Sequence, residues 1–160
     1  MNLYIRQKVF SFADRYSICN YDGEPIFQVE GEVFSWGAKI RLYTLQGEEL
    51  FYIKQKLMVF LPEYEIYAGD TLCARVKKEF SFFRPQLTVE STYGNFVLDG
   101  SFWAMDFNIL CNGEIVGEVH KEWLTWGDTY CLSIPNHVNA AFFSSLVIAI
   151  DNCLHNGQNK

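Results

Sequence analysis

The sequence lacks the patterns that usually mark catalysis or metal binding. It has no Gly-x-Ser-x-Gly, phosphate-loop or dinucleotide signature, and its three histidines, His120, His137 and His155, lack metal-ligand spacing. The five cysteines are odd in number and form no Cys-x-x-Cys pair. They predict free thiols in a reducing compartment, the alternative being a disulfide or metal site. We therefore expect no cofactor, no bound metal and no enzyme.

The chain also lacks an excess of positive charge and a long apolar run. Its net charge is −6, and an acidic chain is a poor general nucleic-acid binder because phosphate contacts dominate that affinity. The longest apolar run, Ala140 to Ile150, would span about 17 Å as a helix, against roughly 30 Å of hydrocarbon in a bilayer. No secretory signal pattern opens the sequence. We expect a cytoplasmic protein without a transmembrane segment, peripheral attachment to a membrane remaining open.

Aromatic residues, by contrast, are abundant, at 17% of the chain, and favour strands. Turn-forming pairs recur between apolar runs, and each pair predicts a hairpin: Asp22-Gly23, Gln46-Gly47, Gly69-Asp70, Gly94-Asn95 and Asn112-Gly113. Five hairpins supply ten strands, and the runs Leu3–Phe10 and Thr129–Ile134 supply two more. No linker divides residues 1–160, so one domain of about a dozen antiparallel strands is expected.

The last segment predicts a buried helix from Asn136 to about Leu154. Pro135 ends the preceding strand, and Asn136 is a suitable N-cap. Ala140 to Ile150 has no charged face, and a helix that is apolar all round must be buried on every side. A sheet that closes around the helix achieves this and also removes exposed strand edges. The fold class is therefore mainly β, a closed antiparallel barrel enclosing a C-terminal helix.

Six short segments resemble the LURP-one-related family, which has the tubby C-terminal-like fold: Arg6–Phe12, Val29–Gly31, Ser35–Gly37, Ile53–Lys56, Leu61–Tyr64 and Val147–Asp151. Phospholipid scramblases look like more distant relatives. The resemblance implies this fold more than a function. The basic pair with which tubby proteins bind phosphoinositides would fall at Glu32 and Phe34, neither of which is basic. The segment that matches the scramblase calcium site has one carboxylate, Asp128, which is too few oxygen ligands for calcium.

Basic residues occur in pairs spaced two apart, which places both members of a pair on one face of a strand. The pairs are Arg6/Lys8, Lys39/Arg41, Lys54/Lys56 and Arg75/Lys77. If their strands are neighbours, the last three pairs form a cationic patch for anionic lipid. The alternative is a solvated barrel exterior on which these residues are balanced by glutamates, namely Glu30, Glu32, Glu48, Glu49 and Glu65.

Two kinds of buried polar group also need partners. Gln7 and Gln55 point inward if their basic neighbours point outward, and they are expected to bond barrel backbone or Ser144 and Ser145. Asp151 is a carboxylate at a helix C-terminus, where the dipole disfavours it, so a partner is expected there.

The function predicted from these features is that of a non-enzymatic binding or scaffold domain, with anionic phospholipid or a protein partner as ligand. One alternative is an enzyme with a rim site near Asp151 or a histidine. A second is a scramblase-like, membrane-associated role in which the apolar helix enters a bilayer.

Overall fold

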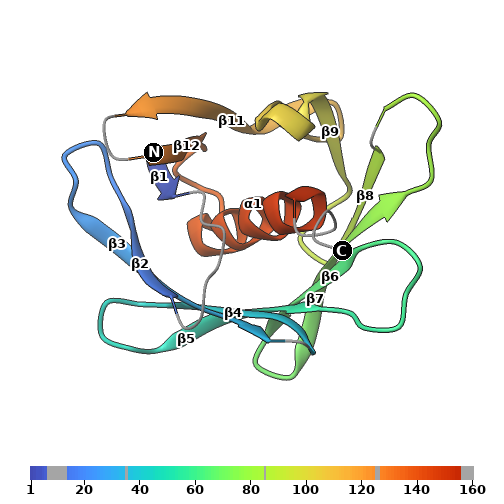
Figure 1. The fold of residues 1–160 in the computed structure, drawn as a ribbon. Coiled ribbons are helices and arrows are strands. Elements are labelled where there is room, and N and C mark those ends of the chain that lie inside the picture. Colours follow the sequence, from blue (N-terminus) through green and yellow to red (C-terminus); the bar gives the residue numbers. More distant parts are fainter. Residues whose placement is uncertain (7–13, 35, 85, 125–126, 156–160) are drawn as a thin grey trace.

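Twelve antiparallel strands form a closed barrel around one α-helix in the computed structural model (Figure 1). The structure describes residues 1–6, 14–34, 36–84, 86–124 and 127–155. The strands are β1 (Asn2–Arg6), β2 (Asp14–Cys19), β3 (Pro25–Phe34), β4 (Gly37–Tyr43), β5 (Glu49–Gln55), β6 (Glu63–Ala68), β7 (Thr71–Glu79), β8 (Gln86–Ser91), β9 (Phe96–Ser101), β10 (Asp106–Cys111), β11 (Glu114–Leu124) and β12 (Gly127–Ser133). A short 3₁₀ turn, η1 (Phe102–Ala104), precedes β10, and helix α1 (Ala140–His155) ends the described chain. The predicted fold class is confirmed.

Each strand pairs with the next along the chain, and β1 pairs with β12 to close the barrel. The five predicted turns all join two strands as expected. Asn112 and Gly113 both have positive φ, at 53° and 83°, which is the conformation of a two-residue hairpin turn. The predicted strand Leu3–Phe10 begins within β1, while its last part lies outside the described residues. The predicted strand Thr129–Ile134 is β12.

Alternation along the strands separates the core from the outer face. In β4, Ala38, Ile40 and Leu42 are buried, whereas Lys39 and Arg41 are only half-buried. Because successive side chains point to opposite faces, the basic residues lie on the outside of the barrel. The predicted inward position of Gln55 is consistent with its contact, because its Oε1 accepts a hydrogen bond from the Ala38 N–H at 3.0 Å. Gln7 lies outside the described residues.

The helix begins at Ala140, so the expected start and N-cap at Asn136 were wrong. The side chain of Asn139 caps the helix, since its Oδ1 accepts a hydrogen bond from the Phe142 N–H at 2.9 Å. Asn136 faces the N-terminal amine of Met1, whose nitrogen lies 3.3 Å from its Oδ1. His137 is therefore exposed in the turn before the helix and lies outside the first helical turn.

The interior position of the helix is confirmed by its burial. Every residue from Ala141 to Leu154 is buried. Phe142 contacts the rings of Phe51, Tyr93 and Phe96, which come from different parts of the barrel wall and its turns. Among the residues that the structure describes, no helix is long and apolar enough to cross a membrane.

Candidate binding surface

The six basic residues proposed from the sequence lie on one continuous part of the outer sheet. Lys39 and Arg41 are on β4, Lys54 is on β5, and Lys56 follows that strand directly. Arg75 and Lys77 are on β7. Strands β4, β5, β6 and β7 are consecutive neighbours, so the structure brings the three pairs together. Arg6 is at the end of β1 and does not belong to this group, and Lys8 lies outside the described residues.

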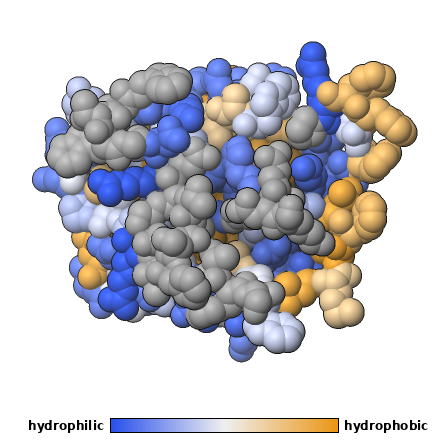
Figure 2. Space-filling view, in the orientation of Figure 1, coloured by the Kyte–Doolittle hydropathy of each residue, from blue (hydrophilic) through white to orange (hydrophobic). Residues whose placement is uncertain are grey.

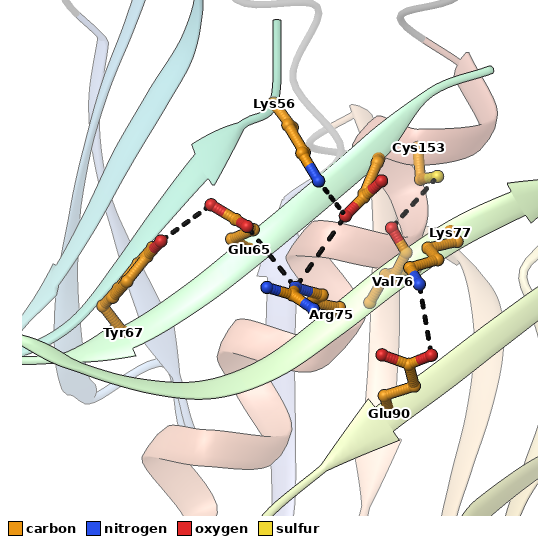
Figure 3. Close-up of polar contacts among 9 residues, drawn as sticks. Lys56, Glu65, Tyr67, Arg75, Val76, Lys77, Glu90 and Cys153 are labelled. Carbon is orange, nitrogen blue, oxygen red and sulfur yellow. Dashed lines mark hydrogen bonds and ion pairs between the residues drawn. The ribbon is translucent and has the colours of Figure 1, made fainter. Parts of the chain in front are cut away.

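Four of these six residues have carboxylate partners. This agrees with the alternative that glutamates balance the basic residues on the outside of the barrel. Arg41 Nε lies 3.3 Å from Glu49, Lys56 Nζ 3.2 Å from Glu63, Arg75 Nε 3.4 Å from Glu65, and Lys77 Nζ 3.1 Å from Glu90. Figure 3 shows Lys56, after β5, and Arg75 and Lys77, on β7, turned towards carboxylates on β6 and β8. Two predicted partners, Glu49 and Glu65, are thus correct, whereas Glu63 and Glu90 were not foreseen.

Lys39 and Lys54 differ from the other four. They lie directly opposite each other in the register of β4 and β5, which places two like charges side by side. Glu65 lies across from Lys54 in β6, but this carboxylate accepts a hydrogen bond from the Tyr67 hydroxyl and pairs with Arg75. Within the described part of the chain, neither lysine has an ion pair. Glu32 lies across from Lys39 in β3, and both residues are described, but no ion pair joins the two. Because like charges directly opposite are destabilising, the lysine pair is a position that can accept an added anion.

A second feature lies beside these lysines, at the end of the barrel where the helix ends. The loop 56–62 follows β5, and the loop 80–84 follows β7, so both leave the same end of the sheet. They carry large apolar side chains that are at least two-thirds exposed: Met58 (104%), Phe60 (95%), Phe80 (67%), Phe82 (84%) and Phe83 (97%). We call these five residues the aromatic rim. Figure 2 shows hydrophobic side chains gathered on this side of the molecule.

The two loops are held together and against the rest of the barrel. The Lys78 N–H, near the end of β7, donates a hydrogen bond at 2.9 Å to the carbonyl of Pro62, the last residue of the first loop, so the first loop is held next to the point where the second begins. The Cys153 thiol of the helix also donates to the Pro62 carbonyl, at a sulfur–oxygen distance of 3.4 Å. Burial raises the pKa of this thiol to about 12, so it stays protonated as a donor. The rim is therefore anchored to a rigid part of the molecule.

Sequence analysis missed the aromatic rim. The available signal was Phe80-Ser81-Phe82-Phe83-Arg84, an aromatic run without the alternation of a half-buried strand. Such a run also fits a buried strand in a chain this rich in phenylalanine. Only the barrel topology places it in a loop next to Met58 and Phe60.

Charge is distributed unevenly around the barrel. Residues 54–63 and 77–86 together hold five Lys and Arg residues and two Glu, although the whole chain has a net charge of −6. Strands β9 to β12 and their turns carry the acidic excess, with Asp99, Asp106, Glu114 and Asp128 exposed. The molecule therefore has a basic side, which includes the aromatic rim, and an acidic side.

Asp151 lies at the same end of the barrel but is buried, with 8% of its surface exposed. Its Oδ1 accepts a hydrogen bond from the Tyr130 hydroxyl at 3.0 Å and lies 2.7 Å from Nδ1 of His155. The hydrogen bond to Asp151 raises the pKa of His155, and desolvation together with Asp151 raises that of Tyr130. These contacts make Asp151 a carboxylate with structural partners.

The surroundings of Asp151 leave little free space. The cavity lined by Tyr16, Tyr130, Asp151 and Asn152 measures about 10 Å³, which is about enough for one water molecule. The other two histidines lie elsewhere, His120 on β11 beside the exposed Asp106 and His137 before the helix. The described residues contain no group of three or more side chains arranged to hold a metal ion.

Comparison with known proteins identifies the family of this chain. Residues 1–151 match the sequence profile of the LURP-one-related proteins. The chain belongs to the LURP-one-related family. The uncharacterised protein YxjI of Bacillus subtilis (strain 168) is 32% identical over 160 residues, which cover 100% of this chain and 98% of YxjI.

A solved structure shows the same fold. An X-ray structure of a protein from Arabidopsis thaliana superposes with a TM-score of 0.67 at 20% sequence identity, covering 94% of this chain and 89% of the plant protein. The LURP-one-related resemblance stated from the sequence is thus confirmed for both family and fold.

Proposed function

We propose that this LURP-one-related domain is a non-enzymatic binding module that attaches to anionic phospholipid through the outer face of β4–β7. The observation that carries the proposal is the pair Lys39 and Lys54, two neighbouring cations on adjacent strands without an ion pair in the described structure. A phosphate or carboxylate headgroup between them would relieve their mutual repulsion.

The neighbouring ion pairs support the same surface. The ion pair between Lys77 and Glu90 is exposed, and such pairs are each worth about 0–1 kcal/mol, so Lys77 can exchange its carboxylate for a headgroup at little cost. Near an anionic membrane each Lys or Arg contributes about 1 kcal/mol of attraction. The acidic side of the barrel would be repelled by the same membrane, and the domain would therefore bind in one orientation.

Vesicle flotation tests the proposal, using phosphatidylcholine vesicles with and without phosphatidylserine. Binding should require phosphatidylserine and should weaken as salt rises, because salt screens exposed charges. The double variant Lys39→Ala/Lys54→Ala should bind less tightly, by about thirtyfold if each lysine contributes roughly 1 kcal/mol.

The matched control is Arg15→Ala/Lys121→Ala, which removes two positive charges from β2 and β11 and so gives the same net charge. This control should bind as the wild type does. Equal binding to both kinds of vesicle would refute the proposal, and so would equal losses in the two double variants. Binding that ignores lipid composition would instead favour a protein ligand.

The alternative of an enzyme with a site at the end of the barrel, near Asp151 or a histidine, has less support. Substrate pockets measure about 300–1,000 Å³, whereas the cavity beside Asp151 measures about 10 Å³. The scramblase-like alternative requires α1 to leave an interior in which all residues from Ala141 to Leu154 are buried.

A further inference from the structure

We propose that the aromatic rim inserts into the boundary between headgroups and acyl chains of a phospholipid bilayer and so sets the depth and orientation of membrane attachment. The inference rests on the proposed binding of anionic phospholipid, but it adds a second kind of contact at different residues. Lys39 and Lys54 supply charge, and the rim supplies apolar surface.

The exposure of the rim is unusual for a soluble protein. Single exposed apolar side chains are common, but contiguous patches of large ones mark interaction sites. Phe60, Phe82 and Phe83 are each more than four-fifths exposed. Side chains this exposed protrude from the surface, which suits entry into a fluid apolar phase.

The rim is also preorganised. Phe80 and Phe82 pack edge to face, with ring centroids 5.0 Å apart. The hydrogen bond from Lys78 to Pro62 fixes the two loops relative to each other. Leu57 packs against Gly37, where an added Cβ would lie 2.8 Å from the Leu57 Cδ2 atom. Trp36, which precedes this glycine, is itself exposed and extends the apolar surface towards β3.

The charges around the rim favour a bilayer over a second copy of the chain. Two rims that met face to face would bring together two surfaces with the same basic excess, which opposes dimerisation. An anionic bilayer has the opposite charge to the rim and offers an apolar phase just beneath its headgroups. Apolar insertion combined with basic residues is the usual combination in stable peripheral attachment.

The test compares two triple variants of the full chain. Phe60→Ser/Phe82→Ser/Phe83→Ser removes the rim, and Tyr21→Ser/Leu45→Ser/Val97→Ser removes three exposed apolar residues from other parts of the surface. Insertion is measured as the rise in surface pressure of a phosphatidylcholine–phosphatidylserine monolayer, and binding by flotation of vesicles of the same composition.

The wild type and the control should raise the pressure, and the rim variant should not. The rim variant should bind vesicles roughly tenfold or more weakly, since three Phe side chains no longer leave water. Its remaining binding should disappear in high salt, because only screened charge contacts are left.

Further measurements separate insertion from folding and from the proposed function. Phe60→Leu/Phe82→Leu/Phe83→Leu keeps the apolar surface and should insert, and all variants should unfold at the wild-type urea concentration.

A Phe60→Ser/Phe82→Ser/Phe83→Ser variant that inserts like the wild type would overturn the inference while leaving phosphatidylserine-dependent binding intact. Insertion into pure phosphatidylcholine that is unaffected by Lys39→Ala/Lys54→Ala would support the rim and refute the charge-based function. A wild-type dimer that the rim variant dissociates, without any insertion, would identify the rim as a self-association surface and overturn the inference.

Discussion

Asp151 links the end of the helix to the barrel wall through its contact with Tyr130, and it also contacts His155 in the last turn of the helix. A carboxylate at a helix C-terminus opposes the helix dipole, whereas a protonated histidine in the last turn complements it. The hydrogen bond from His155 therefore offsets the unfavourable position of Asp151. The need for a partner was predictable from the sequence. The identity of Tyr130 was not, because it lies 21 residues away on β12 and reaches Asp151 only in the folded barrel.

At this scale we predict a pH-dependent contribution of His155 to stability. Its pKa is raised in the folded protein, so protonation favours folding. The contribution is complete below the ordinary histidine pKa of about 6.5 and is lost as pH rises through the raised value. The wild type should exceed His155→Gln by about 0.5–1 kcal/mol at low pH, as is typical for a cation at a helix C-terminus.

Urea unfolding at a series of pH values from mildly acidic to mildly alkaline measures this difference. The stability difference between wild type and variant should shrink as pH rises, because His155 loses its proton. Other titrating groups affect both proteins alike and so cancel in the difference. A difference that does not change with pH would mean that His155 acts through packing alone.

Helix α1 shows how far element boundaries can be derived from sequence. Its apolar character on every face correctly predicted complete burial, because no other environment suits such a helix. Its first residue was misplaced because Asn136 and Asn139 are equally suitable N-caps. The choice depends on tertiary geometry, since the turn after β12 places Asn136 beside the Met1 amine and leaves Asn139 to begin the helix.

At the scale of this element, Asn139→Ala should lower the free energy of unfolding by about 1 kcal/mol, because a backbone N–H at the helix start loses its acceptor. Asn136→Ala is the matched control and should change stability by less than about 0.5 kcal/mol, since its contact with the amine is exposed. Chemical denaturation of both variants measures the two effects. Equal losses would show that Asn136 also stabilises the helix start.

The whole barrel is closed, but its strands are not joined equally. Strands β10 and β9 pair over six residues, whereas β8 and β9 share a single pair, Val89 with Phe96. Strands β1 and β2 also share a single pair, Tyr4 with Cys19, among the described residues. The pairing of β8 with β9 is therefore weaker than that of β9 with β10. Two strands that share so few backbone hydrogen bonds separate locally more easily than well-paired strands do.

At this scale we expect hydrogen exchange to be fast where β8 meets β9. Amides of β8 and β9 should exchange faster than those of the β10–β11 hairpin, which pairs along most of its length. Exchange measured by mass spectrometry on peptides from the intact protein tests this expectation. Uniform protection around the barrel would show that β8 and β9 are held together more firmly than their pairing indicates.

The architecture was predictable from the sequence to a greater extent than the binding surface. Turn pairs such as Asn112-Gly113 are local signals, and together with the apolar helix they determined the strand count and closure. The basic pairs were also visible as local signals. Their neutralisation by Glu63 and Glu90 depends on register between strands, which no local pattern encodes. The aromatic rim depends on two loops meeting at one end of the barrel, which only the closed topology brings about.

The order of elements along the chain has a consequence for synthesis. Strands β1 to β12 all precede α1, so the ribosome releases the wall of the barrel before the helix that fills it. Until the helix emerges, residues such as Ile40, Ile53 and Ile66 have no helix to pack against. The apolar inner face of the wall is therefore exposed during synthesis until α1 emerges, and the growing chain is most prone to aggregate in that interval.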